Sequence, residues 1–295
     1  MLSTFYEVIT GREPVMLRAY LLAVLVQMVA VNALAELGYL NVGVPPSFGL
    51  ATVIAGFVFG IGMVLAAGCA GSVFYRAGEG KLDYLYVVAA FALSAWLSND
   101  WLVGPILRFF HSNGLSTTLH HALTIDRMLL AVIVVVAIIL WVIRGQDRSY
   151  KGGWKWSWTG LCIGLIGTAA WTVRAIDGKP FGLGTMQGSD GLATLLLEWD
   201  LSAINGSLLM VLGIPLGSFI ASRMCGKSPG RPLGSKRIRL ALTGGLLMGI
   251  SAAVAAGDNV LHGLSGVPIL AVSSLSFMLF VFLGVWTGVK FKWLA

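Results

Sequence analysis

The sequence predicts an all-α, polytopic integral membrane protein, and two observations support this fold class. The first is composition: 57% of the 295 residues are hydrophobic and only 11% are charged, whereas soluble domains carry about 25% charged residues. The second is the bunching of the apolar residues, since residues 128–143 and 267–289 contain no charge. Such runs approach or exceed the ~20 residues that cross a hydrocarbon core of about 30 Å. We therefore expect one transmembrane domain over residues 1–295.

The apolar runs predict eight spanning helices. They lie near residues 17–35, 48–68, 82–98, 128–143, 157–175, 203–222, 239–257 and 267–289. Residues 101–110 could add a short or re-entrant helix, which would change the number of spans by one.

The charged residues predict how these spans are oriented. The net charge is +7, and the basic residues cluster at 144–155 and 223–239. An excess of Lys and Arg marks the cytoplasmic loops of a membrane protein. Two spans separate the clusters, so both fall on one side, both termini are predicted to be cytoplasmic, and residues 176–202 become an external loop. Because orientation accounts for the charge, we expect no nucleic-acid partner.

Two segments of the chain resemble each other. Residues 56–70 read GFVFGIGMVLAAGCA and residues 245–259 read GLLMGISAAVAAGDN. Without a gap, Cys69 meets Asp258. The match predicts an internal duplication, with repeat one near 17–143 and repeat two near 157–289, and the loop charges give the two copies opposite directions. Inverted repeats are typical of secondary transporters, whose substrate site lies near the midplane where helices are interrupted.

The first copy is too long to be one spanning helix. Residues 42–75 are almost uncharged, and as one helix they would reach about 50 Å at about 1.5 Å per residue. A break around Gly68 or Gly71 would hold Cys69 inside the membrane.

In the second copy, Asp258 and Asn259 lie between two apolar runs. An ionisable residue within the membrane is by default a functional candidate. The alternative is a short, solvated external loop that contains Asp258, Asn259 and His262.

Four stretches resemble one known family. The pattern from Gly60 to Gly80, the stretch GGWKWSWTGLCIGLIG at 152–167, LGIPLGSF at 212–219 and the second repeat segment are similar to the YeeE/YedE family of bacterial thiosulfate permeases. The resemblance implies an hourglass-shaped protein of the bacterial inner (plasma) membrane, with internal pseudo-symmetry. It also implies that thiosulfate passes along cysteine thiols near a constriction, and that a small cytoplasmic TusA-like sulfur-carrier protein is a partner.

One departure from the family matters for the site. The family's second repeat normally ends in Gly-Cys, and this chain has Gly257-Asp258. Cys69 is therefore the only cysteine that matches a functional position of the family, and we interpret Cys162 and Cys225 as packing and surface residues. Asp258 could be protonated, could be paired with a cation, or could signal a substrate that is not a dianion. We favour a protonated or proton-coupled carboxyl.

These observations define the predicted site. The expected substrate-binding residues are Gly68, Cys69, Ala70, Gly71, Gly257, Asp258 and Asn259, with Arg76 as a candidate guide for the anion. No metal or cofactor is expected, because the three cysteines lie far apart and form no CxxC pair. The adjacent His120 and His121 would point in different directions on a helix.

The predicted function is inward transport of a small sulfur-containing anion, either thiosulfate or a related sulfur or selenium compound, through a constriction at Cys69. Two alternatives stay open. The chain could be a non-transporting membrane subunit that anchors a cytoplasmic sulfur-carrier partner. It could also be a membrane thiol oxidoreductase, although that activity would need a paired cysteine or a quinone site. No P-loop is present, which excludes an intrinsic ATPase but not an external one. For the favoured function of transport we expect no enzyme activity.

Overall fold

The computed structural model describes residues 1–99, 117–124, 127–144, 153–176, 178, 181–226 and 233–291. The helices of these residues are α1 (Leu2–Ile9), α2 (Val15–Glu36), α3 (Leu50–Leu65), α4 (Ala70–Gly78), α5 (Asp83–Leu97), α7 (Leu119–Leu123), α8 (Arg127–Ile143), α9 (Trp156–Ile176), α10 (Met186–Leu197), η2 (Leu201–Ala203), α11 (Gly206–Met224), α12 (Ser235–Val254), η3 (Leu261–Gly266) and α13 (Val272–Lys290). An isolated bridge joins Thr118 and Ala271, and the described residues form no β-strand. The all-helical prediction is confirmed.

Each of the eight predicted spans contains a helix, namely α2, α3, α5, α8, α9, α11, α12 and α13. Within the described ranges, six segments are long and apolar enough to cross a membrane, while Asp83–Leu97 and Leu129–Ile143 are shorter apolar helices. The chain is therefore a multi-pass membrane protein. The short helix expected near 101–110 lies outside the described residues.

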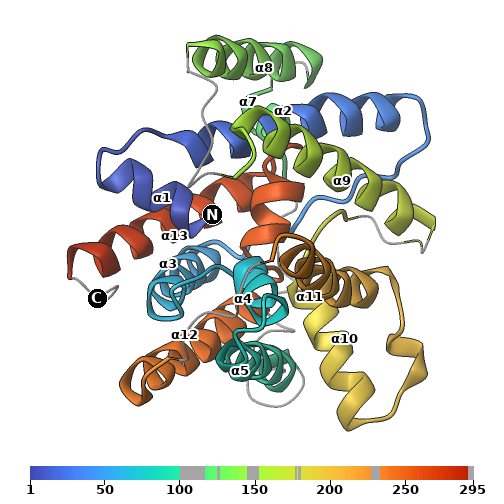
Figure 1. The fold of residues 1–295 in the computed structure, drawn as a ribbon. Helices are drawn as coiled ribbons and strands as arrows, with labels where there is room; N and C mark the ends of the chain where they lie inside the picture. Colours follow the sequence, from blue (N-terminus) through green and yellow to red (C-terminus); the bar gives the residue numbers. More distant parts are fainter. Residues whose placement is uncertain are drawn as a thin grey trace.

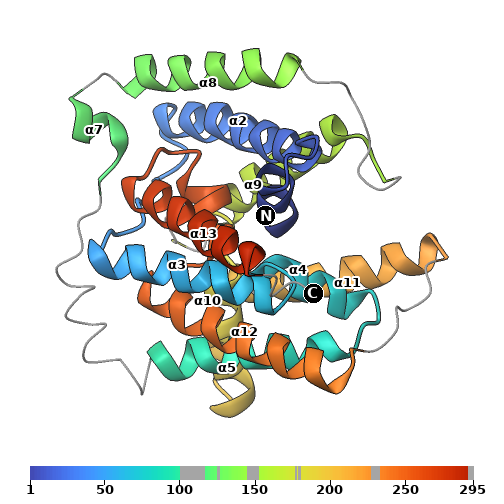
Figure 2. The same ribbon diagram turned by 90° about the vertical axis from the view of Figure 1, so that its left-hand side faces the viewer.

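The arrangement of the helices is visible in two views (Figures 1 and 2). Most long helices run across Figure 2, and α8 lies along the outer edge against α2. The apolar side chains of α8 are widely exposed, for example Val132 at 57% and Leu140 at 57%. An exposed apolar helix face is suited to lipid.

The core is built from α3, α5, α12 and α13. α3 packs on α13, α12 packs on α5, and α3 and α12 pack on each other. Glycines allow the backbones to approach closely, as is common in membrane helices: a Cβ at Gly284 would collide with the backbone of Phe57, and a Cβ at Gly60 with that of Val281.

These contacts pair up as a duplication requires. If α3 corresponds to α12 and α5 to α13, the α3–α13 and α12–α5 contacts are equivalent. α1 packs on α2 and α13, and α10 packs on α11 and α5 in the same relation. We infer that α1–α5 and α10–α13 are the two repeats, with α8 and α9 between them. The repeats expected from the sequence, near 17–143 and 157–289, differ from this division because they leave out α1 and include α7, α8 and α9.

The expected external loop at 176–202 is the main difference from the prediction. It contains α10, and residues 182–185 just before that helix are all buried. With only 12 residues and Asp190 among them, α10 falls below the ~20-residue length by which a spanning helix is recognised. Tertiary contacts hold the segment in place: Gly188 packs against the backbone of Ser207, and the hydroxyl of Ser265 donates to the carbonyl of Leu183 at 2.8 Å.

Candidate functional site

The first repeat segment is broken, as its length predicted. α3 ends at Leu65 and α4 begins at Ala70. The Gly68 N–H bonds back to the Met63 carbonyl at 3.0 Å, which is the 6→1 bond of a helix C-terminal cap. Ala67 has φ +53°, a left-handed conformation that costs an ordinary residue roughly 1–2 kcal/mol.

The second repeat segment is broken at the aligned position. The Gly257 N–H bonds to the Ala252 carbonyl at 2.9 Å, and Ala256 has φ +54°. The two breaks therefore share a hydrogen-bond pattern and an alanine in the same unusual conformation. This local likeness supports the ungapped alignment that sets Cys69 opposite Asp258.

Cys69 lies at the first break as the N-cap residue of α4. Its side chain is buried, with 8% of the residue exposed. Its carbonyl accepts bonds from the N–H and the hydroxyl of Ser72, both at 2.9 Å. The thiol is therefore held at a helix N-terminus inside the protein.

Asn259 joins the two breaks. Its Oδ1 atom accepts a hydrogen bond from the Ala70 N–H at 3.3 Å, and a Cβ at Gly71 would lie 3.6 Å from Val260 Cγ2. Asn259 is fully buried, and its Nδ2 atom has no hydrogen-bond partner among the residues that the structure describes. The predicted residues of the two repeats thus come together, and one buried amide donor between them is left unused.

Asp258 is fully buried and is surrounded by donors. Its Oδ2 accepts from the N–H of Thr185 at 3.0 Å and closely from the hydroxyl of the same residue, and its Oδ1 accepts from the Leu261 N–H at 2.8 Å. Asp258 therefore caps the helical stretch 259–266 and binds the N-terminus of α10. Among the described residues, Asp258 forms no ion pair with a Lys or Arg, so pairing with a cation receives no support.

His262 is also fully buried. Its Nε2 is 3.3 Å from the Ala255 carbonyl and its Nδ1 is 2.9 Å from the Ser274 hydroxyl. Because a carbonyl can only accept, Nε2 carries a proton and donates it in a hydrogen bond to Ala255. Asp258, Asn259 and His262 are all 0% exposed, so the solvated external loop considered as the alternative is wrong.

Arg76 lies seven residues after Cys69 on α4. One guanidinium nitrogen donates to the Ala67 carbonyl and to the Tyr84 hydroxyl, both at 2.6 Å, and the guanidinium lies 5.1 Å from the centre of the Tyr84 ring. Arg76 thus donates a hydrogen bond to Ala67, the residue of the first break that has the left-handed conformation. A role in guiding the anion stays a prediction.

Thr185 is the site residue that sequence reasoning missed. It is fully buried and reaches Asp258 from the segment expected to be external. The preceding Gly182 lies directly against the indole of Trp171, where a Cβ would be 2.5 Å from Nε1. The sequence gives no indication that this threonine is buried beside Asp258, because it lies in a Gly-rich stretch. Only the folded chain shows that the stretch enters the core.

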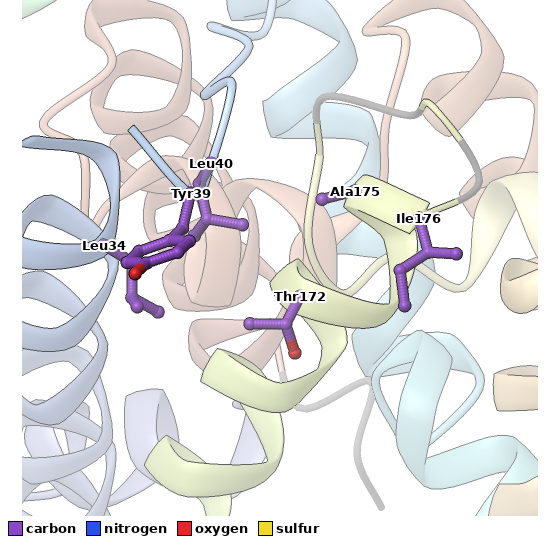
Figure 3. Close-up of a pocket in the computed structure, with 6 residues that line it drawn as sticks. All are labelled: Leu34, Tyr39, Leu40, Thr172, Ala175 and Ile176. Atoms are coloured by element: carbon purple, nitrogen blue, oxygen red, sulfur yellow. The ribbon is translucent and has the colours of Figure 1, made fainter. Parts of the chain in front are cut away.

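A pocket of about 550 Å³ lies elsewhere, between the C-terminal ends of α2 and α9 (Figure 3). It is lined by Leu34, Tyr39, Leu40, Thr172, Ala175 and Ile176. None of the predicted site residues lines it, and its walls are largely apolar. The described residues also contain no group of three or more His, Cys, Asp or Glu that could hold a metal ion.

Comparison with known proteins gives a consistent result. Residues 1–287 match the family described as "Sulphur transport". The chain is 30% identical to the thiosulfate transporter TsuA of Escherichia coli K12, over 92% of this chain and 83% of the relative. It is 28% identical to TsuA of Spirochaeta thermophila, over 97% of this chain and 90% of the relative. A shorter match joins it to the probable transporter YedE of Salmonella typhimurium, 38% identical over 73 residues.

Proposed function

The chain belongs to the sulphur-transport family, and we propose that it carries thiosulfate, or a closely related sulfur-containing anion, inward across the bacterial inner membrane. The two relatives that cover most of the chain are named as thiosulfate transporters, not as enzymes. The proposed route passes between the two helix breaks. The residues proposed to contact the anion are Gly68, Cys69, Ala70, Gly71, Gly257, Asp258 and Asn259.

The observation that carries this proposal is the meeting of helix N-termini around a buried thiol. α4 begins directly after Cys69, and the N-terminus of α10 and the stretch 259–266 begin beside Asp258. The N–H donors at a helix N-terminus carry a partial positive charge, which favours an anion. Such donors can attract a dianion without holding it as a buried Lys or Arg would, and conduction requires that the ion can leave again.

The thiol supplies the second part of the recognition. A neutral Cys is a weak S–H donor with a polarisable sulfur, so Cys69 suits a soft terminal sulfur atom better than it suits a hard oxyanion. The negative charge of Asp258 would oppose a dianion. Three donors on its two oxygens instead suit a carboxylate whose charge is satisfied within the protein. We therefore propose a capping role for Asp258 in place of the protonated form expected from the sequence.

Uptake of labelled thiosulfate tests the proposal, in a strain that lacks other sulfate and thiosulfate importers. The wild type should restore uptake, and Cys69→Ala should abolish it at unchanged expression. Cys162→Ala and Cys225→Ala are the controls, since Cys162 is half-buried and Cys225 exposed, and both should keep uptake. No uptake by the wild type would instead favour a non-transporting subunit. Near-normal uptake by Cys69→Ala would make Cys69 a packing residue.

The TusA-like partner also belongs to this proposal. A small sulfur carrier would receive the imported sulfur on the cytoplasmic side, where we place both termini. Co-purification of such a carrier with the wild type, tested with and without thiosulfate, would detect the complex.

A further inference from the structure

The amide of Asn259 has two ends with different surroundings. Oδ1 bonds the Ala70 N–H at 3.3 Å, and so fixes the orientation of the side chain. Nδ2 is buried and has no partner in the described part of the chain, and Asn259 is 0% exposed. A buried donor without an acceptor is costly and rare in folded proteins. Its presence calls for an acceptor that the described residues do not provide.

The position of Nδ2 indicates what that acceptor is. The two ends of one amide are about 2.3 Å apart by covalent geometry, so Nδ2 lies close to Ala70 and to the N-terminus of α4. Cys69 precedes Ala70 directly. A neutral N–H donor, the N-terminus of α4 and a thiol thus share one small region at the junction of the two repeats.

We propose that Asn259 Nδ2 binds an oxygen atom of the transported anion and thereby selects tetrahedral sulfur oxyanions. This inference rests on the proposed function and adds a division of roles to it. Cys69 faces the soft terminal sulfur, while Asn259 supplies a hydrogen bond to an oxygen of the same ion. An anion without oxygen atoms, such as hydrosulfide, would leave Nδ2 unpartnered and would be disfavoured.

The sharpest test is Asn259→Asp. The change is nearly isosteric, and the carboxylate can still accept the Ala70 N–H, so the junction of the breaks is kept. It replaces the free donor with a negatively charged acceptor, which repels an oxyanion. We expect thiosulfate uptake to fall by about tenfold or more, the size of a lost hydrogen bond to a charged group. Uptake equal to that of the wild type would overturn the proposal.

The matched control is Asn205→Asp. Asn205 caps α11 through the same atom, since its Oδ1 accepts from the Ser207 and Leu208 N–H groups at 2.9 and 3.3 Å. An aspartate preserves that cap, so this variant should transport as the wild type does. If Asn205→Asp lost uptake to the same degree as Asn259→Asp, the effect would not be specific to the site and the inference would fail.

A second variant covers the case in which Asn259→Asp does not fold. Asn259→Ala removes the donor without adding charge. Binding of thiosulfate to this purified variant is measured by the rise in melting temperature that thiosulfate causes. We expect the concentration that gives half of this rise to increase about tenfold or more. An unchanged concentration would refute the role of Asn259. If the wild type itself neither transports nor is stabilised by thiosulfate, the proposed function fails, and this inference fails with it.

Discussion

At the scale of single residues, Asp258 is the position where structure changes the interpretation most. The sequence indicated an intramembrane acid beside the substrate path. The folded chain shows a helix cap whose oxygens receive three donors from Thr185 and Leu261. The residue that differs from the family's cysteine thus holds α10 against the second break.

This role leads to a stability prediction for Asp258→Asn. The amide places an NH₂ group against the N–H donor of either Thr185 or Leu261, so at least one bond is lost inside the protein. We expect the free energy of unfolding to fall by about 1–3 kcal/mol, measured as a lower melting temperature of the purified protein.

Asp200→Asn serves as the comparison, because Asp200 also caps a helix and bonds the Ser202 N–H at 2.9 Å, but in an exposed position. The Asp200 variant should change stability by less than about 0.5 kcal/mol. Equal stability of the two variants would show that Asp258 is not a structural cap.

At the scale of elements, long apolar helices were predictable and short buried ones were not. A run such as 267–289 is long and uncharged, which is enough to predict a helix in lipid. Its helix can therefore be recognised without knowledge of its neighbours. The break at Gly68 was predictable for a related reason, since the apolar run around it is too long for one span. α10 and Thr185 depend instead on contacts with distant segments, including Asp258, and such contacts leave no periodic pattern in the sequence.

Glycine packing between α3 and α13 gives a prediction at this scale. In Gly284→Ala, the new Cβ would meet the Phe57 carbonyl and would also lie 3.0 Å from Gly60 Cα. These are backbone atoms that cannot move aside like a side chain. We expect a loss of about 1–3 kcal/mol in stability from overpacking, again measured by thermal unfolding in detergent.

Gly213→Ala on α11 is the matched control. A Cβ at Gly213 meets nothing within 4 Å, so this variant should be neutral or slightly more stable, because alanine is the better helix former. A Gly284→Ala protein as stable as the Gly213→Ala protein would contradict the close packing of α3 on α13.

At the scale of the whole molecule, the helix ends place the two basic loops on one side, and the cytoplasmic location of that side stays a prediction from the loop charges. The chain leaves α8 and α11 on the same side of the molecule and enters α9 and α12 from that side (Figure 2). The basic loops that join these helix pairs were the two assigned to the cytoplasm.

Reporter fusions test this orientation directly. Fusions at residue 230 and at the C-terminus should both report a cytoplasmic location. A fusion at residue 200, which lies between α10 and α11, should report an external one. An external signal from residue 230 or from the C-terminus would reverse the assignment of sides and remove the support for inward transport.

The central claim is that the anion binds between the two breaks, beside Cys69. The most direct test of this claim is whether thiosulfate protects the Cys69 thiol from alkylation. The experiment uses the variant Cys162→Ser, Cys225→Ser, in which Cys69 is the remaining cysteine. A small membrane-permeant alkylating reagent should modify Cys69 slowly, because only 8% of the residue is exposed. Thiosulfate should slow the reaction further in a saturable manner, while an equal concentration of chloride should not. A rate of alkylation that thiosulfate leaves unchanged, in a protein that still transports thiosulfate, would contradict the account.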